Sequence, residues 1–514
     1  MTMLKRLVKM VAEKKAHAID KMLEHQQEVM ESKLTSILRR HHDTVYGRKY
    51  GFESIRTAEQ YAERVPLVDA EKLRPYFGMT YVDPKGGILT KDPVIWYLQT
   101  SGTTGHPKRV PITRPGLKDS SRGSAMTWMS FINAEEENAD ILDGTLVTFG
   151  AASVLDWVNG IPVGYATGVY ARHQNRLFQR LIKPGEDIFN ITDMDTKMRA
   201  YARILATENV TGLQGITTLS LSLIRRMQDQ YGPWLAEELS NSEGRNRILA
   251  SLDDEGRLDV SQLWPNLRLF LASGIDTTPY KVWMTKTFPN LSVVEIYGAS
   301  EGVFAGQLLE PQEGMQLFAN THYFEFIREN DANEPNPAVI PLSEVKVGSR
   351  YEIVLTNIQG YYRYRLGDVM TFTSTDPYSV SRISRRGKVV NLSGEKVSDA
   401  HASIAMSEAC RRTGAQVVDY TLLGVIENGI GHYTIAALFR DDSVDSIEFV
   451  QTFEESMMSI NPEFRVVREV GALGPTVLKR LKVPYFDEVV KQSHLQAKPH
   501  CLTTSKDVLS LCES

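Results

Sequence analysis

Residues 98–112, LQTSGTTGHPKRVPI, combine small, hydroxylated and basic side chains in an order suited to binding an anion. The apolar run before them, residues 94–98, is β-branched and aromatic and predicts a buried strand. Glycines let the backbone approach a ligand closely, and hydroxyl and N–H donors favour phosphate. The pattern is not a Walker A loop, because no hydroxyl residue follows the lysine, and an ordinary strand-to-strand turn stays open. The predicted phosphate-binding residues are Ser101, Gly102, Thr103, Thr104 and Lys108.

A second candidate stretch is residues 293–302, VVEIYGASEG. The pattern predicts a strand that stops at Tyr297, whose ring could stack on a nucleotide base. Glu301 is a hard oxygen ligand where Mg²⁺ beside phosphates would need one. Gly298 and Ser300 belong to the same predicted nucleotide-binding turn. Alone this signal is weak, because many strands end in glycine and an acidic residue.

The third candidate stretch is residues 361–369, YYRYRLGDV, which follows an alternating strand predicted at 351–356. Asp368 could accept two hydrogen bonds from a ribose diol. Arg363 and Arg365 could bind phosphate or carboxylate groups. An internal ion pair that closes a sheet edge explains the same residues equally well.

The elements that must position these stretches are predicted from hydrophobic periodicity. Residues 4–42 predict two amphipathic helices, and residues 142–304 alternate short apolar runs with helical stretches, which indicates α/β organisation. Residues 116–133 predict a helix that carries Arg122, either as a surface residue or facing a substrate carboxylate. A hairpin turned at Asn428-Gly429 and a helix at 443–460 predict a second, small α/β domain.

Composition limits the class of protein. With 514 residues, 42% hydrophobic and 24% charged, the chain predicts about two to four globular domains. A net charge of -5 argues against a general nucleic-acid surface. Three cysteines without metal-site spacing favour a reducing compartment, and no apolar run approaches the ~18 residues that span a bilayer. The basic N-terminal segment lacks signal-peptide features, so we expect a cytoplasmic protein that does not associate with membranes.

Taken together and in this order, SGTTGHPK, YGASE and YRYRLGD resemble the motifs of the adenylate-forming enzyme superfamily. The third motif is more discriminating. With YEIVLTNIQG before it, it is similar to the plant auxin-responsive acyl-acid amido synthetases, the Gretchen Hagen 3 family, whereas ordinary CoA ligases carry a shorter Tyr-Arg-Thr-Gly-Asp version. The similarity extends from residues 44–52 to 386–399 and 496–501. Departures include Thr104, where many plant members have serine, and His500, where arginine is usual.

The resemblance implies an α/β fold with a large N-terminal domain of mixed sheets and helices and a β-barrel-like part. A small, mobile α/β C-terminal domain would follow. We place the domains at residues 1–375 and 376–514, with a hinge at residues 373–378, TSTDPY. The implied reaction has two steps. A carboxylate attacks the α-phosphorus of ATP to give an acyl-adenylate and pyrophosphate, and the amine of an amino acid then displaces AMP.

The resemblance also implies roles for single residues. Lys396 and Lys498 would be catalytic cations of the mobile domain, Glu301 would hold Mg²⁺, and Asp368 would bind the ribose of ATP. Arg122 and Trp157 are predicted to line the acyl-acid site. Two alternatives stay open: a CoA ligase that uses the same first step, and a nucleotide-binding regulator that has lost catalysis. We expect small-molecule partners and favour a monomer; neither the acid nor the amino acid can be identified from the sequence.

Overall fold

The computed structural model describes residues 3–99, 108–174, 179–239, 243–274, 276–308, 314–386, 389–393, 395–427, 430–440, 443–469, 471–492 and 501–513. The chain forms two compact units. Unit one comprises residues 1–192, 211–215 and 294–386, and unit two comprises 193–210, 216–293 and 387–514. Each unit joins segments that are distant in sequence. The expected α/β class is confirmed, and the domain boundary at residue 375 stays a prediction.

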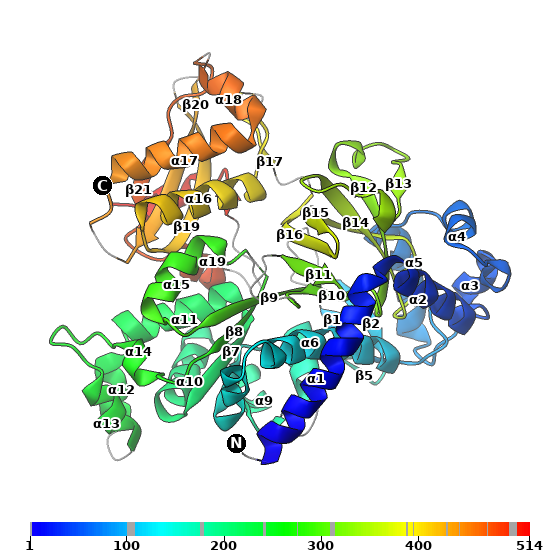
Figure 1. Cartoon of the computed structure of the whole chain (residues 1–514), viewed down its shortest axis with the longest axis horizontal. Helices are drawn as coiled ribbons and strands as arrows, with labels where there is room; N and C mark the ends of the chain where they lie inside the picture. Colours follow the sequence, from blue (N-terminus) through cyan, green and yellow to red (C-terminus); the bar gives the residue numbers. More distant parts are fainter. Residues whose placement is uncertain are drawn as a thin grey trace. The chain divides into compact units, whose positions relative to one another are not determined.

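Unit one begins with α1 (Met3–Glu24) and α2 (Gln26–His41), the two predicted amphipathic helices (Figure 1). Their apolar stripes are buried in the core of the unit, where Ile19, Met30 and Ile37 are almost fully covered. The predicted helix at 116–133 is α6 (Arg114–Ala134), which begins at the N-cap Thr113. The other helices of this unit are α3 (Val45–Lys49), η1 (Phe52–Ser54), α4 (Ala58–Arg64), α5 (Ala70–Val82), η2 (Glu137–Asp143), α7 (Ala166–Arg172), α9 (Glu186–Phe189), η4 (Glu329–Asp331) and η5 (Leu342–Glu344).

The strands of unit one form an antiparallel run in the order β13-β12-β14-β15-β16-β11-β10-β9 and a separate sheet in the order β2-β1-β5-β4. A parallel pair, β3 and β6, and strand β7 complete the unit. The strands are β1 (Val94–Gln99), β2 (Arg109–Thr113), β3 (Thr145–Thr148), β4 (Asp156–Val158), β5 (Ile161–Gly164), β6 (Ile182–Lys183), β7 (Val210–Ile216), β9 (Ser292–Ala299), β10 (Gly302–Gly306), β11 (Met315–Leu317), β12 (His322–Arg328), β13 (Val339–Ile340), β14 (Arg350–Asn357), β15 (Tyr364–Thr375) and β16 (Tyr378–Arg385).

Strand β14 has the polar alternation that the sequence predicted, but both of its faces are buried. Its apolar side chains, such as Ile353 and Leu355, lie in the main core. Its polar side chains are covered as well, because Glu352 pairs with Arg365 and Thr356 bonds to the hydroxyl of Tyr61 at 2.9 Å. The alternating polarity of β14 therefore reflects one apolar face and one face with buried polar side chains. Neither face is exposed to solvent.

The predicted hinge at residues 373–378 is wrong. Strands β15 and β16 pair antiparallel up to Thr375 and Tyr378, so the Asp376-Pro377 step between them is a tight hairpin turn inside unit one. Aspartate followed by proline suits a turn as well as a linker, and composition alone does not distinguish the two.

Unit two contains a sheet in the order β21-β20-β19-β22, and helices α16 and α17 lie side by side over it (Figure 1). The predicted hairpin is β19 (Val417–Glu427) with β20 (Ile430–Phe439), and its turn, Asn428-Gly429, lies outside the described residues. The predicted helix at 443–460 is α17 (Ser446–Ile460). The remaining elements are α10 (Met194–Thr207), α11 (Thr217–Asp229), α12 (Gly232–Glu238), α13 (Glu243–Ala250), α14 (Val260–Leu263), β8 (Leu269–Ser273), η3 (Thr278–Tyr280), α15 (Lys281–Thr287), β17 (Val389–Val390), β18 (Val397–Ser398), α16 (Asp399–Thr413), α18 (Pro462–Glu469), β21 (Val477–Arg480), α19 (Tyr485–Gln492), β22 (Leu502–Thr503) and η6 (Lys506–Leu511).

A buried charged cluster joins α11, β19 and α19 inside unit two. Arg225 donates to Asp487 at 2.9 Å and lies 3.7 Å from Asp419, whose carboxylate also accepts the backbone N–H of Phe486 at 2.9 Å. All three charged side chains are almost fully buried. Burial, together with the nearby Asp487, raises the pKa of Asp419 to about 7 against the pull of Arg225.

We expect Asp419→Asn to change how stability depends on pH. The folded pKa of about 7 lies above the unfolded value of about 3.9, so the folded protein binds the proton more tightly and loses stability as pH rises between these values. Asparagine cannot ionise, so the stability of the variant relative to wild type should increase from pH 5 to pH 8. Urea unfolding at each pH measures this, and parallel curves for the two proteins would contradict it.

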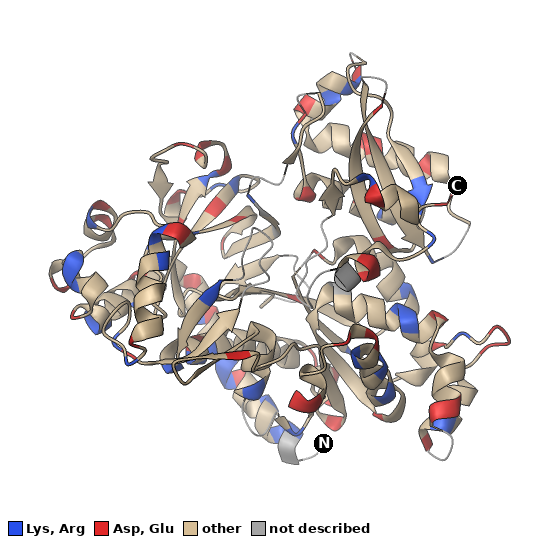
Figure 2. Ribbon diagram, turned by 180° about the vertical axis from the view of Figure 1, so that it is seen from behind, with Lys and Arg blue, Asp and Glu red and all other residues tan. Residues whose placement is uncertain are grey.

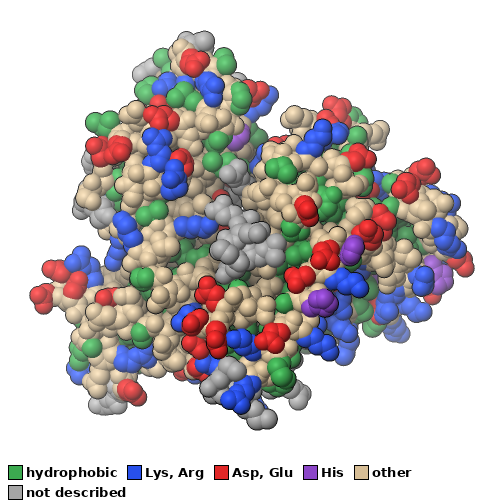
Figure 3. Space-filling view, in the orientation of Figure 1, with side chains coloured by type: hydrophobic (Ala, Val, Ile, Leu, Met, Phe, Trp, Pro, Cys, Tyr) green, Lys and Arg blue, Asp and Glu red, His purple; other side chains and the backbone are tan. Residues whose placement is uncertain are grey.

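Surface charge is mixed. Acidic and basic side chains are interspersed along the helices (Figure 2) and over the face shown in Figure 3. Among the described helices, none is both long and apolar enough to cross a membrane.

Candidate active site

The second motif forms a β-hairpin and does not end at a strand terminus. Strand β9 continues past Tyr297 to Ala299 and pairs with β10 from Gly302 onward, so Ser300 and Glu301 form the tip. Gly302 has a φ of +153°, and a Cβ atom there would lie 2.8 Å from the imidazole of His322. Only glycine fits this position without strain or a clash. The tight turn presents Glu301 in a half-buried position.

Two predicted nucleotide-binding residues contact each other directly. The hydroxyl of Tyr297 on β9 donates to Oδ2 of Asp368 on β15 at 2.7 Å, across 71 positions of sequence. Tyr297 is only 8% exposed, and its ring packs 5.2 Å from that of Phe304. The structure thus brings the second and third motifs together, with Asp368 oriented by a buried phenol.

Three tyrosines surround Glu301. Tyr364, the first residue of β15, donates its hydroxyl to Oε1 of Glu301 at 3.3 Å. Burial raises the pKa of Tyr361 above its ordinary value, and the charge of Glu301 raises it further. Burial likewise raises the pKa of Tyr170 to about 12, with a smaller contribution from Glu301. A phenol is already neutral at physiological pH, and these raised pKa values favour the neutral form further.

The two arginines of the third motif are held by buried glutamates. Arg363 pairs with Glu325 at 3.0 Å and donates to the carbonyl of Ala62 at 2.6 Å. Arg365 forms a two-bond pair with Glu352, which is fully buried. These contacts favour the structural interpretation of both arginines, and nucleotide binding by Arg365 stays a prediction.

The predicted phosphate loop lies largely outside the described residues. Ser101, Gly102, Thr103 and Thr104 fall in that gap, between β1 and β2, which pair antiparallel on either side of it. Lys108 is described, is exposed, and directly precedes β2. The structure therefore shows two antiparallel strands, β1 and β2, that flank the predicted phosphate-binding residues.

The two residues predicted for the acyl site lie on different elements of unit one. Arg122 on α6 is about half exposed, and its Nη1 lies 3.2 Å from Oδ1 of Asp119. Trp157 on β4 is 60% exposed.

Of the two predicted catalytic lysines, one is described. Lys396 belongs to unit two, is 65% exposed, and lies 3.7 Å from Glu463. Lys498, with its lysine-proline motif, lies outside the described residues.

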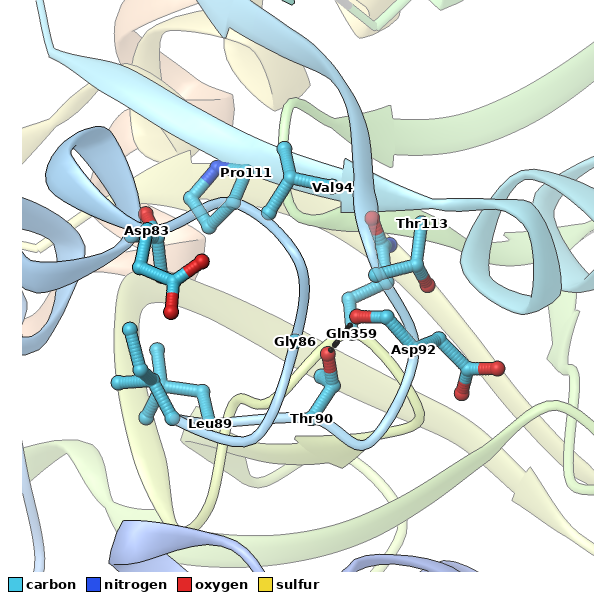
Figure 4. A pocket seen from close by; sticks show the side chains of 11 residues that line it. Asp83, Gly86, Leu89, Thr90, Asp92, Val94, Pro111, Thr113 and Gln359 are labelled. Carbon is cyan, nitrogen blue, oxygen red and sulfur yellow. Dashed lines mark hydrogen bonds between the residues drawn. The ribbon is translucent and has the colours of Figure 1, made fainter. Parts of the chain in front are cut away.

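A small cavity lies near Gln359 in unit one (Figure 4). Its volume is about 10 Å³, which is at the lower limit for a single water molecule. Two of its lining residues bond to each other, since Thr90 Oγ1 donates to the backbone oxygen of Asp92 at 2.8 Å. The Asp92 carboxylate pairs with Arg40. The cavity is too small for a nucleotide or an acyl acid.

Sequence reasoning missed two residues beside the hairpin tip. The side-chain amides of Asn357, the last residue of β14, and Gln359, in the turn that follows, both donate to the backbone oxygen of Glu301. The sequence feature that could have indicated them is the pair of amide residues, Asn357 and Gln359, in TNIQG immediately before YYRYR.

The fold is that of the adenylate-forming ligases. The chain is similar to a solved acyl acid amido synthetase, AtGH3.15 in complex with 2,4-DB, with a TM-score of 0.77 and 19% identity over 98% of this chain and 96% of that one. It is also similar to 2-hydroxyisobutyryl-CoA ligase in the postadenylation state, with a TM-score of 0.58 and 13% identity over 94% and 90% of the two chains.

The chain belongs to the GH3 family. The family's N-terminal domain matches residues 15–302, its central domain residues 315–381, and its C-terminal domain residues 400–507. Relatives include indole-3-acetic acid-amido synthetase GH3.2 of Arabidopsis thaliana, 24% identical over 89% of this chain and 94% of its own length. Jasmonoyl–L-amino acid synthetase JAR4 of Nicotiana attenuata is 26% identical over 88% and 86%. The resemblance drawn from the three motifs is confirmed.

Proposed function

We propose that this protein is an ATP-dependent acyl-acid amido synthetase, which activates a carboxylic acid as its adenylate and joins it to an amino acid. The observation that carries the proposal is the match of all three GH3 domains, in order, between residues 15 and 507. The two relatives are named for different acids, one as an indole-3-acetic acid-amido synthetase and the other as a jasmonoyl–L-amino acid synthetase. The acid and the amino acid used by this protein are not defined by those names.

The residues of unit one bind and orient ATP. Asp368 accepts the ribose hydroxyls, and Tyr297 fixes the carboxylate that does so. Gly298, on β9, and Ser300, at the tip of the hairpin, lie beside the nucleotide in this proposal. The loop with Ser101, Gly102, Thr103 and Thr104 donates to the phosphates, and Lys108 adds positive charge. Holding two anions in line for attack can lower the barrier by about 7–11 kcal/mol in ideal cases.

The donor set around Glu301 fits Mg²⁺. Among the described residues there is no cluster of three or more His, Cys, Asp or Glu side chains that could hold a metal. Mg²⁺ in nucleotide sites commonly takes one or two carboxylates together with phosphate oxygens and water, and Glu301 offers one such carboxylate. The ion would supply charge neutralisation of the phosphates when bound.

The second half-reaction involves the C-terminal domain in this proposal. Lys396 and Lys498 are the cations that approach the α-phosphate or the acyl carboxylate as that domain moves. Domain motion, a monomeric state and a cytoplasmic location are parts of the same proposal.

Arg122 is the proposed partner of the acyl carboxylate. We expect Arg122→Ala to raise the KM for the acid by about 10-fold to 100-fold, the value of a hydrogen bond between charged groups, with the KM for ATP unchanged. Lys118→Ala is the matched control, because Lys118 is exposed on the same helix. Steady-state kinetics with the identified acid measure both constants, and equal acid KM values in the two variants would contradict this assignment. Trp157→Ala tests the second predicted acid contact in the same assay.

The reaction itself is tested by AMP release from ATP and Mg²⁺ with a pool of carboxylic acids, run with amino acids, with CoA, and with neither. AMP that rises only with amino acids supports the proposal, and mass spectrometry of the product identifies both substrates. AMP that rises only with CoA identifies a thioester ligase instead. If no AMP forms in any mixture while ATP still binds, the nucleotide-binding regulator is favoured.

A further inference from the structure

The end of β14 and the turn after it form hydrogen bonds to the backbone of Glu301. Nδ2 of Asn357 donates to the backbone oxygen of Glu301 at 2.8 Å, and Nε2 of Gln359 donates to the same oxygen at 2.9 Å. A carbonyl oxygen has two lone pairs, so these two bonds saturate it. A local hydrogen bond also stabilises this turn, because Oδ1 of Asn357 accepts the backbone N–H of Gln359 at 2.9 Å.

The same segment of chain also orients the carboxylate. Tyr364 follows the turn and donates to Oε1 of Glu301 at 3.3 Å. This distance is longer than the usual 2.7–2.8 Å of an O–H···O bond, so the phenol directs the carboxylate through a weak hydrogen bond. A divalent cation requires a carboxylate ligand that is held in a fixed orientation.

The packing around Gln359 makes room for this arrangement. A Cβ atom on Gly116, near the N-terminus of α6, would lie 2.1 Å from Cγ and 2.6 Å from Cδ of Gln359. The glutamine side chain therefore passes directly against a glycine backbone. Any larger residue at position 116 would push Gln359 away from Glu301.

We propose that Asn357, Gln359 and Tyr364 are positioning residues for Glu301, which preset its carboxylate as a ligand for the divalent cation of the bound nucleotide. This inference rests on the proposed function, because it takes Glu301 as the metal ligand. It adds that the residues before and within the third motif act through Glu301 and need not touch the nucleotide themselves. Groups that orient a metal ligand typically contribute 10-fold to 100-fold in metal affinity.

The test is Mn²⁺ binding to the full-length protein in the presence of saturating ATP, followed by electron paramagnetic resonance. This measurement needs neither the acid nor turnover. The variants are Tyr364→Phe and Gln359→Met, with Glu301→Gln as reference. The matched control is Tyr361→Phe, since the buried Tyr361 hydroxyl has no hydrogen-bond partner within the described part of the chain. Gly116→Ala displaces Gln359 without altering any of the three positioning residues.

We expect Tyr364→Phe, Gln359→Met and Gly116→Ala each to weaken Mn²⁺ binding by about 10-fold, and Tyr361→Phe to change it less than twofold. Thermal unfolding of each variant separates this effect from a loss of folding. Equal Mn²⁺ affinity in Tyr364→Phe and Tyr361→Phe, with Glu301→Gln impaired, would overturn the positioning roles. Unchanged Mn²⁺ binding in Glu301→Gln, or no ATP-dependent Mn²⁺ binding in wild type, would show that Glu301 is not the metal ligand and would overturn the whole inference. Failure of the proposed reaction is seen separately, in the product assay.

Discussion

Asp368→Ala is expected to weaken ATP binding by about 100-fold or more. The variant removes the proposed acceptor of two ribose hydroxyls, and hydrogen bonds to a charged group are worth about 1.5–3 kcal/mol each. It also leaves the buried hydroxyl of Tyr297 without its 2.7 Å acceptor. Titration calorimetry with ATP measures the effect without knowledge of the acid.

Tyr297→Phe separates the two parts of this effect. It keeps the ring against Phe304 and removes the bond to Asp368, so we expect a loss of about 10-fold or less in ATP affinity. Urea unfolding of both variants serves as the control for folding. An Asp368→Ala protein that binds ATP like wild type would remove Asp368 from the proposed nucleotide site.

The helices and strands of this fold were predicted from the sequence more successfully than the contacts that these elements make with one another. The helices at 4–42, 116–133 and 443–460 and the hairpin at 421–439 were predicted from periodicity and turn residues, which are local signals. The hairpin of β9 and β10 was missed, because its glycines and Ser300 resemble a strand end. Recognising the turn would have required knowing that β10 pairs back onto β9.

The parts of the candidate site that were not predicted depend on contacts between residues that are distant in sequence. Arg363 and Arg365 could bind either a ligand or an internal partner, and the glutamates that hold them come from β12 and β14. Tyr297 and Asp368 were singled out separately, and nothing in the spacing indicated that they would meet. Asn357 and Gln359 were passed over because amides beside a glycine are also what an ordinary turn contains. Residue type predicts what a side chain can do, whereas its partner depends on the tertiary fold.

Arg225→Met is expected to cause the largest loss of stability in this protein, about 3–5 kcal/mol in the free energy of unfolding. The side chain is 3% exposed and lies between Asp419 and Asp487. Methionine keeps an unbranched apolar stem but is shorter and carries no charge, so both buried carboxylates lose their shared cation. Arg226 lies 3.4 Å from Asp487 and compensates only in part.

The matched control is Arg257→Met, which removes a cation from an exposed pair. Arg257 and Asp253 are about half exposed, and such pairs contribute about 0–1 kcal/mol. Urea unfolding at pH 7 compares the two variants. A loss from Arg225→Met as small as that from Arg257→Met would show that the buried cluster contributes no more than a surface pair.

The pH dependence of the Arg225→Met defect tests its cause. Without the arginine, the folded-state pKa of Asp419 should rise further above about 7, because the group that lowers it is gone. A folded pKa above the unfolded one means that stability falls as pH rises. The defect should therefore be larger at pH 8 than at pH 5, where the aspartate can take up a proton. Because Arg225 lies on α11, while Asp419 and Asp487 lie in the segment that matches the GH3 C-terminal domain, this cluster ties that domain to α11 within unit two.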